Sequence, residues 1–412
     1  MAQNNRFDKA PYTSDGPVSD APVEVELPSE TTSETDESGN QVISFGETPE
    51  TDKPEVAFGD NLADGMDDTA LRVLGAELVR KFEADKVSRA DWEKTYTGGL
   101  ELLGLNIMTT SDPWPGACAV FHPILTEAAV RFQAQAITEI WPATGPCRTK
   151  IIGKTSPDLD KQAQRIEDDM NLCLTERMPE YRSEMERLLF NLPLTGSAFK
   201  KVYADPYLKR PCAMYVPAED LVVGYGATDL ASCERYTHVM KRTEGEMRRL
   251  IRSGFYLDVD LPEPTQRSDK TEEKKDKITG VIPSIDTDGR YTILEMYVDM
   301  DLPEFSEESM YVPYVVTIDY SSNLVLAIRR NWKEGDPEFL RRQHMVAYHY
   351  IPGLGFYGLG LFHLIGGVAK AATVILRQLI DAGTLATLPA GLKTKGLRIK
   401  NEDQPIRPAE WR

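Results

Sequence analysis

The segment from Tyr181 to Val223 constrains the fold more than any other part of the chain. Its first half carries apolar residues at spacings of three and four, which predicts a helix with one buried face (Met185, Leu188, Leu189 and Leu192). We expect Pro193 to end this helix, because proline lacks the backbone N–H and crowds the preceding turn. Gly196 then permits a sharp reversal, and two strands follow, separated by a turn at Asp205-Pro206. The pattern predicts an α+β scaffold and contains no catalytic motif.

The net charge of −18 is concentrated near the N-terminal end. Residues 1–68 hold three basic and 17 acidic residues, a net of −14, which leaves −4 for residues 69–412. Residues 1–68 are also poor in large apolar side chains, so they cannot bury enough surface to offset the entropy of ordering. We predict an acidic disordered tail here, either solvated or docking on a partner. The nearly neutral remainder neither demands nor excludes a nucleic-acid partner.

The rest of the chain divides where its composition changes. We expect a helical and α+β core over residues 69–258, a flexible charged insertion over 259–290, an antiparallel β subdomain over 291–352, and a glycine-rich turn with a long helix over 353–412. Helices are predicted to start near Thr69, near Ser88 at a capping-box-like Ser-Arg-Ala-Asp, at Pro123 and at Ser156. A short strand is expected from Cys147 to Ile152.

A glycine-rich motif offers one route to an enzyme. Gly353-Leu-Gly355-Phe-Tyr-Gly358 matches the dinucleotide-binding pattern, since it follows a predicted strand and precedes a helix, with Asp381 downstream. However, Pro352 interrupts the junction, the preceding hairpin indicates antiparallel strands, and no second parallel strand follows the helix. We prefer a turn in which backbones approach closely. A nucleotide-binding enzyme that uses the Gly353–Gly358 loop remains the alternative.

No other motif indicates catalysis, a cofactor or a metal. The five cysteines form no Cys-x-x-Cys pair, and no two of the five histidines have the metalloprotease spacing. The chain contains neither a P-loop nor a Gly-x-Ser-x-Gly elbow. We therefore expect a non-enzymatic protein without catalytic residues, bound cofactor or metal.

The helix predicted from Leu361 to Ala386 carries small residues suited to close packing against another subunit (Gly366, Gly367, Ala371 and Ala372). The uncharged stretch at 353–369 is shorter than a bilayer span, and Lys370 and Arg377 follow it, so we expect no membrane association. Basic residues in short runs near glycine are the best candidates for contacting DNA phosphates without reading bases (Lys393, Lys395, Arg398 and Lys400).

Three successive motifs resemble a known family. A predicted helix is followed by LTGSAFKKVYADP, then VPAEDLVV, then RYTHVMKRTEGEMRRLI. This order is similar to that in the portal, or head-to-tail connector, proteins of short-tailed, P22-like bacteriophages, and the resemblance extends over roughly residues 65–412. Family members of this type usually continue with further helices, so we expect this chain to be truncated relative to them.

The resemblance implies a fold and a function. The fold would be a portal-type α+β fold with a helical wing, a small antiparallel β subdomain and long helices, assembled as a ring, typically of twelve subunits. As a structural protein of the virion, such a ring would sit at one capsid vertex, contacting the major capsid protein. Double-stranded DNA would pass through it during packaging and genome ejection. The terminase large subunit would dock first, and tail adaptor proteins would replace it. Another head-tail structural protein is a further alternative.

Overall fold

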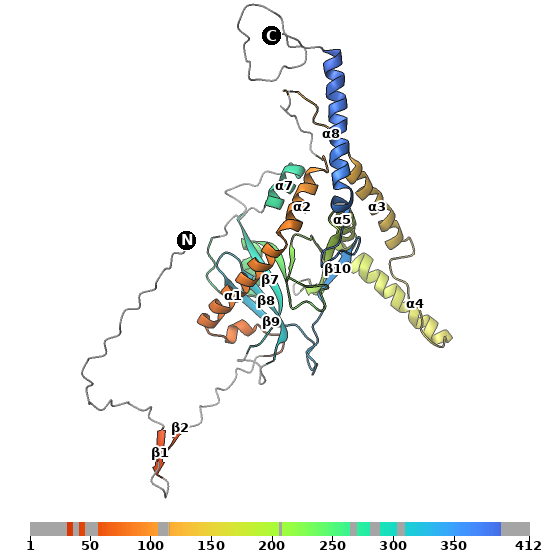
Figure 1. Ribbon diagram of the computed structural model, residues 1–412. Helices are drawn as coiled ribbons and strands as arrows, with labels where there is room; N and C mark the ends of the chain where they lie inside the picture. Colours follow the sequence, from red (N-terminus) through yellow and green to blue (C-terminus); the bar gives the residue numbers. More distant parts are fainter. Residues whose placement is uncertain are drawn as a thin grey trace, which may run out of the picture. The chain divides into compact units, whose positions relative to one another are not determined.

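The computed structural model describes residues 57–105, 114, 116–205, 208–263, 270–280, 289–302 and 310–388, and the backbone of two short strands, β1 (Thr31–Thr35) and β2 (Gln41–Phe45) (Figure 1). The chain divides into two compact units, residues 1–53 and 54–412. Strands β1 and β2 pair antiparallel in the first unit. The second unit holds the remaining described elements.

Two antiparallel sheets lie in the second unit. The smaller sheet has the order β10-β3-β4, and the larger has the order β5-β6-β7-β8-β9. Their strands are β3 (Ser197–Asp205), β4 (Arg210–Val216), β5 (Leu221–Val223), β6 (Arg235–Thr243), β7 (Arg290–Met300), β8 (Val312–Asp319), β9 (Leu324–Arg330) and β10 (Met345–His349). Every strand pair within the described residues is antiparallel, which confirms an α+β chain with antiparallel sheets.

The second unit also contains helices. They are α1 (Asp68–Ser88), α2 (Ala90–Glu101), α3 (Ile124–Ile140), α4 (Pro157–Leu172), α5 (Glu180–Thr195), α6 (Glu244–Arg252), α7 (Lys270–Thr279) and α8 (Leu361–Thr387). A short 3-10 helix, η1 (Leu62–Gly65), precedes α1, and a π-helical turn, η2 (Cys173–Arg177), follows α4.

Each sheet is covered by a helix whose apolar stripe the sequence contains. Helix α1 buries Leu78 and Phe82 against side chains of the large sheet such as Leu294. Helix α5 buries its predicted stripe (Met185, Leu188, Leu189 and Leu192) together with Ala198 of β3. The spacing of three and four therefore identified the covering face of α5, because those positions lie on one side of a helix.

Local signals predicted several element ends correctly. Asp67 caps α1 by accepting a hydrogen bond from the Thr69 N–H at 3.0 Å. Thr243 and Glu246 form a capping box at the start of α6. The hairpin of β8 and β9 is present, and α3 begins directly after Pro123 and ends before Trp141.

Three local predictions are wrong. Helix α5 continues through Pro193 to Thr195, because the N–H of Gly196 still donates to the Leu192 carbonyl at 2.9 Å and Gly196 adopts a left-handed φ of 88°. Ser88 does not cap α2, since its hydroxyl donates to the Asp85 carbonyl at 2.7 Å instead. The segment 147–152 forms no strand, because side chains of α4 take its hydrogen bonds.

The structure also moves two boundaries. Residues 57–68, which the prediction assigns to the acidic tail, are packed within the second unit instead, since Leu62 is fully buried and the Asn61 side chain accepts a hydrogen bond from the Ile328 N–H at 2.9 Å. Within the insertion predicted over 259–290, residues 270–279 form α7, which packs beside α2. Residues 264–269 and 281–288 of that insertion lie outside the described residues.

Candidate interaction surface on helix α8

The glycine-rich motif forms the base of α8 by close backbone packing. A Cβ added to Gly358 would lie 2.4 Å from the carbonyl oxygen of Gly196, and one added to Gly360 would lie 2.4 Å from the Gly196 nitrogen. Ser197 fixes this approach, because its hydroxyl accepts a hydrogen bond from the Gly358 N–H at 2.7 Å. The glycine corner after α5 and the turn before α8 therefore fit against each other only without side chains.

This geometry differs from a dinucleotide-binding loop. Strand β10 ahead of the motif pairs antiparallel with β3, and the described sheets contain no parallel pair from which a βαβ unit could be built. At the motif's second glycine, Gly355, an added Cβ would meet no atom within 4 Å, so the space beside it is open. The preferred interpretation, a turn for close backbone approach, matches the contacts of Gly358.

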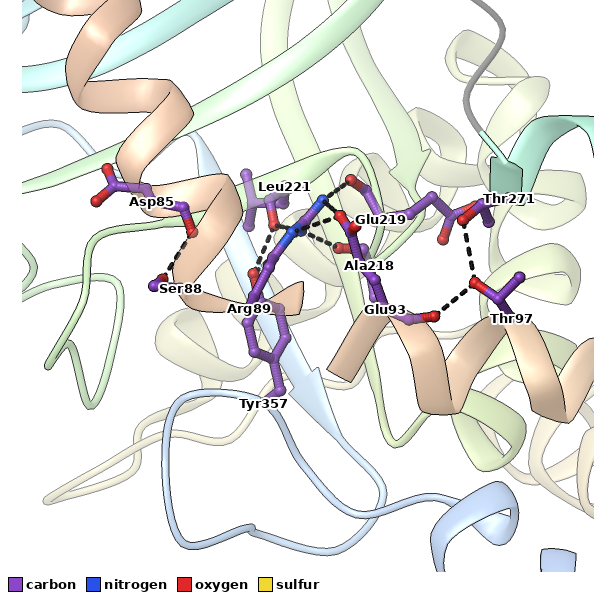
Figure 2. A network of polar contacts seen from close by, with 10 residues as sticks. All are labelled: Asp85, Ser88, Arg89, Glu93, Thr97, Ala218, Glu219, Leu221, Thr271 and Tyr357. Atoms are coloured by element: carbon purple, nitrogen blue, oxygen red, sulfur yellow. Dashed lines mark hydrogen bonds and ion pairs between the residues drawn. The ribbon is translucent and has the colours of Figure 1, made fainter. Parts of the chain in front are cut away.

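Arg89 connects this turn to the rest of the unit (Figure 2). The residue is 6% exposed, and its guanidinium lies among carbonyl oxygens of the loop before β5. It donates to the carbonyls of Ala218 at 3.1 Å and Leu221 at 2.8 Å, to the carbonyl of Glu219, to the Tyr357 hydroxyl at 3.1 Å and to the Glu93 carboxylate at 3.1 Å. One side chain thus holds the junction of α1 and α2, the β5 loop and the glycine-rich turn together.

Aromatic packing continues the connection towards α8. The Trp92 ring stacks on Tyr357 with ring centroids 4.7 Å apart and on Tyr96 with centroids 5.5 Å apart. Tyr96 in turn contacts Phe362 in the first turn of α8. Burial raises the pKa of the Tyr357 hydroxyl, so this group stays neutral and donates to the Leu221 carbonyl at 3.0 Å.

The first half of α8 is docked on its own chain. Phe362, Gly366, Ala369 and Thr373 are buried, and α2, α3 and α5 lie beside this part of the helix (Figure 1). Further along, Arg377 donates to the Val120 carbonyl at 2.8 Å, and the Cys118 N–H donates to the Asp381 carboxylate at 2.9 Å. The segment 118–122 therefore runs along α8 and contacts its charged side.

The opposite side of α8 is apolar, and the described residues leave it uncovered. We call Leu364, Val368, Ala371, Ile375 and Leu379 the α8 stripe; they follow one another at spacings of three and four, and the four large side chains are 48%, 61%, 64% and 70% exposed. Lys370 and Arg377 fall between these residues in the sequence, but they lie on another side of the helix. A contiguous apolar face of this kind is typical of a surface that another molecule covers.

The predicted subunit-packing residues divide between the two sides of the helix. Gly366 is buried by its own chain, and a Cβ added there would lie 3.8 Å from Leu102 of the segment after α2. Gly367 and Ala371 are exposed, and Ala372 is half-buried. The large members of the α8 stripe were not singled out from the sequence, because their spacing is equally typical of a core-facing helix. The predicted DNA-contacting residues (Lys393, Lys395, Arg398 and Lys400) lie outside the described residues.

Helix α8 is also the one helix of the described chain that is long and apolar enough to cross a membrane by length and composition. Thr373 is the last buried position of α8, which leaves residues 374–388 beyond it. At 1.5 Å per residue this part is roughly 22 Å long, whereas a bilayer core is about 30 Å thick. The part of α8 beyond its last buried position is therefore shorter than a bilayer core.

A separate cavity of about 570 Å³ lies between α1, α7 and the large sheet. Its wall carries charges of both signs, and two of its lysines form ion pairs, Lys275 with Glu219 and Lys241 with Glu272. Burial lowers the pKa of Lys275 to about 8. These pairs attach α7 to the body through polar contacts, supported by a 3.4 Å contact between the hydroxyls of Thr97 and Thr271 (Figure 2).

A buried charged group joins the two sheets. Glu295 of β7 contacts the Lys201 ammonium of β3 and lies 3.4 Å from Nδ1 of His238 on β6. Lys201 and His238 hold the pKa of Glu295 well below its ordinary value against the opposing effect of burial, and burial lowers the pKa of His238. None of these three residues lines the cavity beside α7. Within the described residues, no cluster of three or more His, Cys, Asp or Glu side chains could hold a metal ion.

Comparison with known proteins adds no family assignment: no protein-family model and no curated protein matched this chain.

Proposed function

We propose that this chain is the ring-forming subunit of a bacteriophage portal, a structural protein at one capsid vertex through which double-stranded DNA is packaged and ejected. The observation that carries the proposal is the α8 stripe, four large apolar side chains left at least 48% exposed on a helix of 27 residues. Neighbouring copies in a ring would cover that stripe. The order of sequence motifs that resembles the short-tailed phage portals supplies the remaining support.

The proposal assigns the chain a mechanical task. Identical subunits meet through contacts that are repeated around an axis, and a ring closes when the rotation between neighbours permits it. DNA in the channel would be held by sequence-independent phosphate contacts that depend strongly on salt. The ring would offer one end to the terminase large subunit and later to tail adaptor proteins, and its rim to the major capsid protein.

Native mass spectrometry with negative-stain imaging tests the ring. We expect the purified chain to form a closed ring of about a dozen copies, as the resemblance implies and cyclic closure permits. Ile375→Glu should release monomers, since it places a charge in the α8 stripe. Val73→Glu is a matched control, because Val73 on α1 is exposed to the same 64%. A wild-type chain that stays monomeric, or a ring that tolerates Ile375→Glu as well as Val73→Glu, would contradict the proposal.

DNA retention tests the channel. Reversing the charge at Lys393 and Lys395 should weaken the retention of double-stranded DNA and reduce its salt dependence while leaving the ring intact. Unchanged retention by intact rings would remove both lysines from the channel.

A further inference from the structure

Residues 142–178 form an arm built on helix α4. The extended segment before α4 is bonded along one side of the helix: the Asn171 side chain exchanges two hydrogen bonds with the backbone of Cys147, at 2.9 and 3.2 Å. The Thr149 N–H donates to the Glu167 carboxylate at 3.0 Å, and the Thr149 hydroxyl donates to the Ala163 carbonyl at 3.0 Å. These reciprocal contacts hold the arm in one conformation before any partner binds.

The neighbouring face of α4 is apolar and open. Leu159, Ile166 and Met170, which we call the α4 stripe, recur at spacings of seven and four and are 42%, 55% and 47% exposed. Helix α4 contains no buried residue at all, although every one of its positions is described. Ser156 caps the helix, and Pro157 occupies its first turn, so it is a well-formed helix whose α4 stripe is left exposed.

Charge decides which partner fits the α4 stripe. Helix α4 carries five acidic and two basic residues, and Asp158 and Asp169 flank the stripe. Two α4 helices packed together would therefore repel each other. Helix α8 carries two basic residues and one acidic residue, and Lys370 is exposed seven residues before Arg377, on the charged side of the helix. The opposite net charges of the two helices favour their association.

Side-chain size agrees with this pairing. The α4 stripe consists of large side chains, whereas the α8 stripe includes Ala371 next to the exposed Gly367, where another helix can approach closely. Both stripes are open in the same molecule, so one chain does not use its own α4 to cover its own α8.

We infer that the α4 stripe of one copy docks on the α8 stripe of a second copy. The inference rests on the proposed ring, because it names the two surfaces that meet between neighbours. The two surfaces are different, so the contact is heterologous: each copy offers one α4 and one α8, and association continues until the rotation closes a ring. The arm of one copy would then contact α8 of the neighbour. It would cover the side of that helix which the neighbour's own described residues leave exposed.

Two double variants test the pairing. One carries Ile166→Glu and Met170→Glu on α4, and the other carries Ile375→Glu and Leu379→Glu on α8; glutamate is chosen because it keeps helix propensity high. Each variant alone should be monomeric in native mass spectrometry at a concentration at which the wild type assembles. An equimolar mixture should give a heterodimer, because one intact α4 and one intact α8 remain between them. Val73→Glu serves as the control and should assemble like the wild type.

The outcomes separate this inference from the proposed function. Closed rings of the α4 variant, or a mixture without heterodimer, overturn the pairing and leave the ring intact as a proposal. Open filaments that both variants abolish support the pairing and overturn the closed ring. A wild-type chain that never assembles overturns both. Formation of the heterodimer shows in the same experiment that each variant is folded.

Discussion

Replacing Arg89 by methionine should destabilise the second unit strongly. The substitution keeps an unbranched side chain of similar length but removes the guanidinium that binds Glu93, Tyr357 and the carbonyls of the loop before β5. Three buried carbonyls would lose a charged donor, and the Glu93 carboxylate would lose its ion pair at 3.0 Å. The Leu221 carbonyl keeps the Tyr357 hydroxyl as a donor, so three of these four acceptors are left short; at roughly 1 kcal/mol for each, the low end for an unsatisfied buried group, the loss is about 3 kcal/mol. That value lies within the range of about 3–5 kcal/mol for breaking a buried ion pair.

Urea unfolding followed by circular dichroism measures this loss. Arg182→Met is the control, because Arg182 makes an i,i+4 pair with Glu186 with 60% of its side chain exposed, and such pairs contribute about 0.3–0.5 kcal/mol. Both variants are compared with the wild type at equal protein concentration, so that assembly contributes equally. A loss below about 1 kcal/mol for Arg89→Met would show that water replaces the guanidinium, and the reasoning would be refuted.

Two further predictions concern the turn before α8 and the buried charges between the sheets. Gly358→Ala should cost about 1–3 kcal/mol through the clash with Gly196, whereas Gly355→Ala should be nearly neutral because its Cβ meets open space; equal effects in thermal unfolding would refute the backbone-packing role. The pKa of Glu295 is lowered from 4.5 on folding, so its carboxylate stabilises the fold above that pH and the contribution is lost as the pH falls below it. Glu295→Gln should therefore flatten the decline in unfolding free energy between about pH 5 and pH 3, and an unchanged slope would contradict it.

Local sequence signals predicted those parts of the fold that depend on neighbours in the chain. The start of α1 near Thr69, the stripe of α5 and the β8–β9 hairpin each rest on a few adjacent residues. The continuation of α5 through Pro193 was not predicted. The last turn stays helical because the Gly196 N–H donates to the Leu192 carbonyl, although Pro193 has no N–H of its own. A proline in the last turn removes one hydrogen bond, and the packing of α5 on the small sheet outweighs that loss.

The sequence pattern could not predict contacts between segments that are distant in the chain. Arg89 was an ordinary residue in a presumed capping box, yet its partners lie at Ala218, Leu221 and Tyr357. Likewise, the composition of residues 259–290 indicated a flexible insertion, because α7 has few apolar residues and is held by ion pairs that no local period reveals. Such contacts depend on which segments the fold brings together.

Helix α8 shows where the pattern and the structure must be combined. Its sequence is apolar on nearly every side, which is typical of a helix that is surrounded by protein. The structure shows that its own chain supplies only one side of that surrounding, through α2, α3, α5 and the segment 118–122. The spacing of apolar residues indicates that a helix face is buried, but it does not indicate which molecule covers that face. The described residues of its own chain leave the outward apolar face of α8 exposed, and this is the face that we propose a second copy covers.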